Sequence, residues 1–244
     1  MLDMLKRHKV RTTVILILLI LVAAGAAVIK SSTIKTVKVT GNSFYTEEEI
    51  EKILFDSKAE NNTIMCYLND RFGDDRAIPF IERYQIEIVN RHEVEVIVYE
   101  KNIIGYVKYM GSYMYFDRDG TVVESSSKKL KGICEVRGLA FSQIVLHKPL
   151  ETEIKGVFSQ VLLMTQLFEE YKLDIDRINF SKSARVSVTV DKIKIILGSA
   201  EDMDLKIAEM KDILPQLKGM KGTLYLDGIH FGSGSDGTYY FKKD

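Results

Sequence analysis

The sequence is poor in the residues that usually build metal or redox sites. Its 244 residues include two cysteines, four histidines and no tryptophan. Cys66 and Cys134 belong to no CxxC pair and have no histidine arranged beside them, so two separate buried thiols are favoured over a disulfide or a zinc site. The histidines, at positions 8, 92, 147 and 230, are scattered and form no His-Glu-x-x-His motif. We therefore expect no metal and no other cofactor.

The sequence also lacks an excess of one charge. Basic and acidic residues number 34 each, and the first thirty residues hold five of the basic and one of the acidic ones. The remaining chain therefore carries 29 basic against 33 acidic residues. A domain that binds duplex nucleic acid needs a basic face, so nucleic acid is not an expected partner.

No complete catalytic motif is present. Ser125-Ser126-Ser127-Lys128 has Ser-x-x-Lys spacing, but Ser-Asp-Asn is absent and Lys221-Gly222-Thr223 reverses the order of Lys-Thr-Gly. Asp117-Arg118-Asp119-Gly120 resembles the middle of a calcium loop, yet Tyr115 and Ser126 would stand where its first and last charged ligands belong. The residues therefore predict no catalytic site and a plain turn at Asp117.

One uncharged apolar run does stand out, at residues 12–29. Eleven of these eighteen residues are Val, Ile or Leu, and each favours insertion into a bilayer by roughly 0.3 to 0.6 kcal/mol. As a helix the run would span roughly 27 Å of a hydrocarbon core about 30 Å thick. The small residues 23–27 leave a cleaved signal peptide as the alternative, but the run exceeds the usual signal length of about 7 to 15 residues. We expect an uncleaved transmembrane helix.

The charges beside this run predict its orientation. Lys6, Arg7, Lys9 and Arg11 precede it, whereas Lys30 is the only basic residue directly after it. Because basic flanks stay in the cytoplasm, residues 1–11 should form a cytoplasmic tail and the rest of the chain should lie outside.

The next seventy residues predict the order β-α-α-β-β. Residues 34–42 alternate in polarity as a strand does, and Thr46 with Glu49 forms a capping box for a helix. A second helix is predicted from about Asn69 or Asp70 towards Pro79, after a polar loop. Strands at 81–89 and 94–100 close the unit, with the valines at 94, 96 and 98 on one face.

This part of the chain resembles the POTRA domain, and the junction after it, of the FtsQ/DivIB family of bacterial cell-division proteins. The resemblance rests on Val39-Thr40-Gly41-Asn42, on the Glu-rich helix start, and on Val98-Tyr99-Glu100-Lys101 leading into Ile104-Gly105-Tyr106-Val107. Family members commonly carry proline in the turn that Asn90-Arg91-His92-Glu93 occupies here. Asparagine supplies turn geometry as well.

The remaining residues predict a longer, β-rich unit. Hairpins are expected at 103–116, around Gly111, and at 185–197, around Asp191-Lys192. Helices are expected at 151–171 and at 201–214, the second ending near Pro215. Strands at 222–226 and 238–241 would form a final hairpin.

Together the patterns and the resemblance predict an α+β chain. Its parts are a cytoplasmic tail (1–11), a single transmembrane helix (12–29), a small β-α-α-β-β POTRA domain (33–101) and a larger β-rich domain with two packed helices (102–244). The resemblance implies a non-enzymatic division scaffold in the cell membrane at the septum. It would bind small bitopic coiled-coil proteins of the FtsL and FtsB/DivIC kind and help to regulate septal peptidoglycan synthesis. The septal peptidoglycan synthase would be a further candidate partner. The alternatives are a POTRA-bearing transport or assembly component and a membrane-anchored cell-wall enzyme.

The C-terminal hairpin is the expected partner-binding site. It concentrates aromatic side chains within seventeen residues: Tyr225, His230, Phe231, Tyr239, Tyr240 and Phe241. A terminal strand at a sheet edge offers unpaired backbone groups to an incoming strand, and aromatic residues are common binding anchors. The resemblance implies the same location, since residues 225–231 are similar to a family motif from which Gly228 and His230 depart. The alternative is that half of these aromatics fill the core of the domain.

Overall fold

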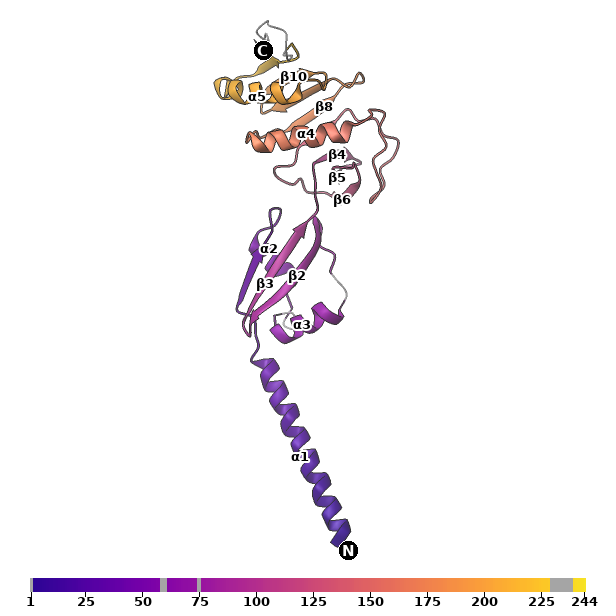
Figure 1. Cartoon of the computed structure of the whole chain (residues 1–244), viewed down its shortest axis with the longest axis vertical. Coiled ribbons are helices and arrows are strands. Elements are labelled where there is room, and N and C mark those ends of the chain that lie inside the picture. Colours follow the sequence, from indigo (N-terminus) through magenta and orange to yellow (C-terminus); the bar gives the residue numbers. More distant parts are fainter. Residues whose placement is uncertain (1, 58–60, 74–75, 229–238) are drawn as a thin grey trace. The chain divides into compact units, whose positions relative to one another are not determined.

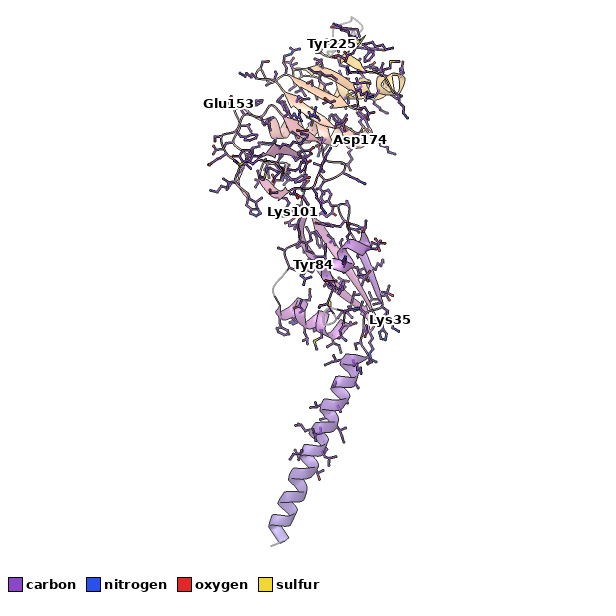
Figure 2. All side chains as sticks on the ribbon, turned by 180° about the vertical axis from the view of Figure 1, so that it is seen from behind. Lys35, Tyr84, Lys101, Glu153, Asp174 and Tyr225 are labelled. Atoms are coloured by element: carbon purple, nitrogen blue, oxygen red, sulfur yellow. The ribbon has the colours of Figure 1, made fainter. Side chains whose placement is uncertain are left out.

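A computed structural model describes residues 2–57, 61–73, 76–228 and 239–244, with side chains from residue 13 onwards (Figure 1). The chain divides into two compact units, residues 1–100 and 101–244. The first unit begins with one continuous helix, α1 (Leu2–Lys30). Among the described residues, α1 is the one helix long and apolar enough to cross a membrane, over Thr13–Lys30. Its side chains from Val14 to Val22 are exposed, and Figure 2 shows them projecting from the helix.

The rest of the first unit has the predicted order of elements. These are β1 (Thr36–Thr40), α2 (Glu47–Leu54), α3 (Thr63–Phe72), β2 (Ile81–Asn90) and β3 (Glu93–Glu100). Strand β3 is central, parallel to β1 and antiparallel to β2. A β-α-α-β-β unit after a single apolar helix is confirmed.

The core of this unit lies on the face predicted for β3. Val96 is fully buried and stands opposite Val39 of β1 and Ile86 of β2. Ile50 and Leu54 of α2 pack into the same cluster. Ile86 is only half-buried.

The capping box of α2 is confirmed, but the start of the second helix was predicted wrongly. Thr46 Oγ1 accepts a bond from Glu49 N, and Glu49 Oε2 accepts one from Thr46 N. Helix α3 begins at Thr63, several residues before the expected Asn69, and ends at Phe72 rather than near Pro79. The reason is its cap, since Asn62 Oδ1 accepts bonds from both Ile64 N and Met65 N.

The second unit is one mixed sheet with two helices. Its elements are β4 (Gly105–Tyr109), β5 (Ser112–Phe116), β6 (Val122–Ser126), β7 (Glu135–Arg137), α4 (Val157–Glu170), β8 (Arg177–Phe180), β9 (Val186–Val190), β10 (Ile193–Gly198), α5 (Met203–Ile213), a 3-10 turn (Leu214–Leu217), β11 (Gly222–Tyr225) and β12 (Tyr240–Lys243). The nine strands run in the order β12-β11-β10-β9-β8-β7-β4-β5-β6. The predicted β-rich fold with two packed helices is confirmed.

The connections explain why this sheet has one covered and one helix-free face. Strands β7 and β8 are parallel and joined through α4, and β10 and β11 are parallel and joined through α5. Parallel neighbours need a crossover, and crossovers share one hand. Both helices therefore pack on the same face of the sheet (Figure 1). Their apolar side chains join one core.

The predicted hairpin turns of this unit are confirmed, but the start of α4 was predicted wrongly. The turns at Gly111 and Asp191 lie between paired strands as expected, and both residues have positive φ. Helix α4, however, begins at Val157 rather than at Glu151. Gly156 precedes it in the left-handed conformation. The helix therefore cannot extend back through Gly156, although the apolar pattern of the sequence predicted it from residue 151. Its stripe at 157, 161, 164 and 168 is buried as predicted.

Candidate functional site

Strand β12 is the last strand of the nine-stranded sheet and pairs on one side with β11. The register joins Gly222 to Lys243, Thr223 to Lys242, Leu224 to Phe241 and Tyr225 to Tyr240. Within the described part of the chain, no strand pairs with its other side. The strand lies later than the predicted 238–241, because it begins opposite Tyr225, the last residue of β11.

The aromatic side chains of the pair separate onto the two faces of the sheet. Tyr225 and Tyr240 stack on the helix-free face, with ring centroids 4.4 Å apart and planes at 11°. Phe241 turns the other way and packs against the core beside buried Leu224. Tyr239 precedes the strand and is exposed. Figure 2 marks Tyr225 in the second unit. The aromatic set therefore divides into core and surface members, as strand alternation requires.

The backbone hydrogen bonds show which groups of β12 face outwards. Asp244 N donates to Lys221 O, and Gly222 N on the opposite edge of β11 donates to Lys192 O. In an antiparallel ladder, every second residue of a strand points its backbone N–H and C=O groups towards the partner strand, and the residues between point theirs away from it. The N–H groups of Lys242 and Tyr240 therefore point to β11, and those of Phe241 and Lys243 point away from the sheet.

Gly222 is required where β11 and β12 meet. A Cβ atom at this position would lie 2.3 Å from the carbonyl oxygen of Lys242 and 2.7 Å from Cζ of Phe241. Only a glycine permits this approach without moving β12. No sequence motif assigned Gly222 a role, although its place in a predicted strand beside aromatic residues was a usable signal.

The other end of β11 is held by an ion pair that the sequence analysis missed. Arg185 Nη2 donates to Asp227 Oδ2 at 2.8 Å. Both side chains are partly exposed, so the pair contributes little stability. It does fix the position of the chain as it leaves β11, next to the close approach of Gly198 to Asp227.

Several predicted residues lie outside the part of the chain that the structure describes. His230 and Phe231 fall in the undescribed range 229–238. The side chains of the topology residues Lys6, Arg7, Lys9 and Arg11 are also outside the described set. Their roles remain predictions.

The helix-free face also holds a charge cluster centred on one buried carboxylate. Glu135 is only 4% exposed; it accepts bonds from Arg137 Nε at 2.6 Å and Arg177 Nε at 3.2 Å, and Lys108 Nζ lies 3.7 Å away. Burial raises the pKa of Glu135, but the bonds from Arg137 and Arg177, with the charges of Arg137 and Lys108, outweigh it and hold the pKa below its ordinary value. The cluster ties β4, β7 and β8 together.

The polar motifs considered in the sequence have structural roles. Asp117 Oδ1 accepts bonds from Asp119 N and Thr121 N, which makes the predicted plain turn. Ser125 lies on β6 rather than at a helix start. Cys66 and Cys134 are both buried, as predicted, and burial raises the pKa of Cys134 to about 12. Among the described residues, no three metal-binding side chains gather.

The chain thus joins an apolar N-terminal helix, a small α+β unit and a mixed sheet in which no described strand pairs with the outer side of β12. Comparison with known proteins gives the family. The family model described as "Cell division protein FtsQ/DivIB, C-terminal" matches residues 105–229, about half of the chain. The chain belongs to the FtsQ/DivIB family of cell-division proteins.

A relative agrees with this assignment. The cell division protein DivIB of Clostridium tetani (strain Massachusetts / E88) is 23% identical over 193 residues, which are 78% of this chain and 72% of that protein. Both matches are to cell-division proteins. The family and helix α1 together make this chain a membrane-anchored division protein.

Proposed function

We propose that the chain is a non-enzymatic bitopic scaffold of the bacterial division machinery. Residues 1–11 are its cytoplasmic tail, 12–29 its membrane span, 33–101 a POTRA domain and 102–244 the partner-binding domain, both outside the cytoplasm. It binds small coiled-coil division proteins of the FtsL and FtsB/DivIC kind at the septum. Through them it helps to regulate septal peptidoglycan synthesis.

The observation that carries this proposal is the outer edge of β12, with which no strand pairs among the residues that the structure describes. The outward N–H groups of Phe241 and Lys243 can donate to a strand added in antiparallel or parallel register. Tyr240 is 57% exposed and stacked on Tyr225, so it offers a rigid aromatic anchor at low entropic cost. Lys242 and Lys243 are exposed and favour an incoming segment that carries acidic side chains. The same lysines also keep the edge from pairing with other copies of itself.

The test compares two substitutions at one exposed position. Lys243→Pro removes an outward N–H group, whereas Lys243→Ala removes the side chain and keeps that group. With the full chain co-expressed with a tagged bitopic partner, the proline variant should lower capture about tenfold, since one lost backbone hydrogen bond and a steric clash together exceed 1.4 kcal/mol. The alanine variant should lose much less.

A second pair of variants tests the aromatic anchor. Tyr240→Glu should weaken capture, and Tyr240→Phe should retain it, because the ring rather than the hydroxyl makes the stack with Tyr225. Unchanged capture by Lys243→Pro and Tyr240→Glu, with β12 still protected from hydrogen exchange, would rule out docking at this edge.

A further inference from the structure

Helix α3 of the first unit has its apolar side turned outwards. Cys66 and Thr63 are its buried residues. The exposed side carries Tyr67 (51% exposed), Leu68 (42%) and Phe72 (79%). Ile64 and Met65 are half-buried and continue the same apolar stripe at helical spacing. Arg71 lies within this stripe. A helix on a water-exposed surface normally shows the opposite arrangement.

The start of α3 is joined directly to the end of α1. Asn62, the N-cap of α3, donates from Nδ2 to Ile29 O at 2.6 Å. Thr63 N donates to Ser32 O at 2.8 Å. The apolar stripe therefore begins within a few residues of the point where the candidate membrane span ends.

The turn between β2 and β3 also contacts the end of α1. Arg91 donates from Nη2 to Val28 O at 3.2 Å and from Nε to Ser32 Oγ at 3.1 Å, and it also contacts Ser31. Val89, just before this turn, is a further exposed apolar residue. Both figures show α3 at the end of this unit where α1 joins it (Figures 1 and 2).

From this arrangement we infer that α3 docks on the lipid surface of the membrane that α1 crosses. Tyr67, Leu68 and Phe72 enter the boundary between headgroups and acyl chains, and Arg71 reaches lipid phosphates. Aromatic and apolar side chains with a flanking cation are the usual composition of interfacial helices, which bury their apolar face by roughly 5 to 10 Å. The inference rests on the proposed membrane anchorage. Lipid is the occupant because the stripe adjoins the end of the span, and Asn62 and Arg91 hold the two together.

The sequence contains no tryptophan. The fluorescence of a single introduced tryptophan can therefore be followed without a contribution from others. The full chain is reconstituted into vesicles of phosphatidylcholine and phosphatidylglycerol with brominated acyl chains. Phe72→Trp is the reporter, and the high exposure of Phe72 makes the change compatible with folding. Glu47→Trp, on the exposed first turn of α2, is the matched control. Leu19→Trp, in α1, reports whether the span is inserted.

We expect Trp at 72 to shift its emission to shorter wavelength and to be quenched by bromine, and Trp at 47 to show neither change. Quenching at 19 without any effect at 72 would overturn the docking of α3 while leaving the anchorage intact. No quenching at 19 would overturn the anchorage, and the docking with it. If Trp at 72 shifts only when a partner protein is added, the stripe is a protein interface and the inference is wrong.

Discussion

At the residue scale, Glu135 shows how the helix-free face is held together. Its carboxylate is buried among the side chains of Arg137, Arg177 and Lys108, which come from three strands. A buried charge is tolerated only when it is paired and hydrogen-bonded. Replacing the carboxylate leaves several cations close together without a counter-charge.

We expect Glu135→Gln to lower the free energy of unfolding of the second unit by about 1 to 3 kcal/mol at neutral pH. Because the folded-state pKa of Glu135 lies below its ordinary value, its stabilisation is present above the ordinary glutamate pKa of about 4.3 and is lost as pH falls through the folded value. Denaturant unfolding across an acidic pH series should show a steeper loss for the native chain than for the variant. Parallel curves would contradict the role of Glu135.

At the scale of elements, outer and central strands contribute differently although their sequences look alike. Strands β2 and β3 both alternate apolar and polar residues, yet the central β3 buries Val94, Val96 and Val98, whereas Ile86 of β2 is half-buried and Ile88 is exposed. Strand β12 likewise depends on one neighbour, and Gly222 is what allows that neighbour to come close.

The first unit allows a test of this difference. Val96→Ala should cost about 2 kcal/mol, from two buried methyl groups at about 0.8 kcal/mol each and the cavity left behind. Ile86→Ala removes more carbon atoms but from a half-buried site, so its cost should lie near or below the low end of the usual range of about 2 to 5 kcal/mol. Hydrogen exchange of β3 in the full chain measures both. A larger loss from Ile86→Ala would refute the burial order.

Gly222→Ala tests the attachment of β12. The added Cβ atom meets the carbonyl of Lys242 and the ring of Phe241, so β12 should separate from β11. Exchange of the Thr223 and Tyr225 amides should then accelerate, while β9 stays protected. Thr223→Ala is the control, since its Cβ already exists in the same strand. Slow exchange in the Gly222 variant would show that the strand pair can relax around the methyl group.

At the scale of the whole molecule, the proposed orientation of α1 in the membrane sets the compartment of both folded units. The basic residues before it motivate a cytoplasmic N-terminus, by the tendency of positive flanks to remain inside. Both folded units would then meet their partners outside the cytoplasm.

A pair of fusions tests this orientation. A reporter enzyme that is active only outside the cytoplasm should work when it is fused after Asp244 and fail when it is fused before Met1. The reverse result would overturn the topology and, with it, the proposed site of partner binding.

The sequence alone determined the features that depend on local pattern. The apolar span, the capping box at Thr46, the alternation of Val94, Val96 and Val98, and the turns at Gly111 and Asp191 all follow from neighbouring residues, so they could be predicted. The FtsQ/DivIB family could also be predicted, from residues 39–42, the Glu-rich helix start and the junction at 98–107, and the family model confirms it.

Only the tertiary structure decided what depends on distant neighbours. The order of strands in the larger sheet and the parallel pairing of β10 with β11 arise from crossovers that no local pattern specifies. The same holds for Lys206, fully buried because its ammonium group donates to the carbonyls of Ser199 and Glu201. The division of the C-terminal aromatics into Phe241 in the core and Tyr240 on the surface also needed the register, because the identity of a side chain does not reveal which face of a sheet will be covered.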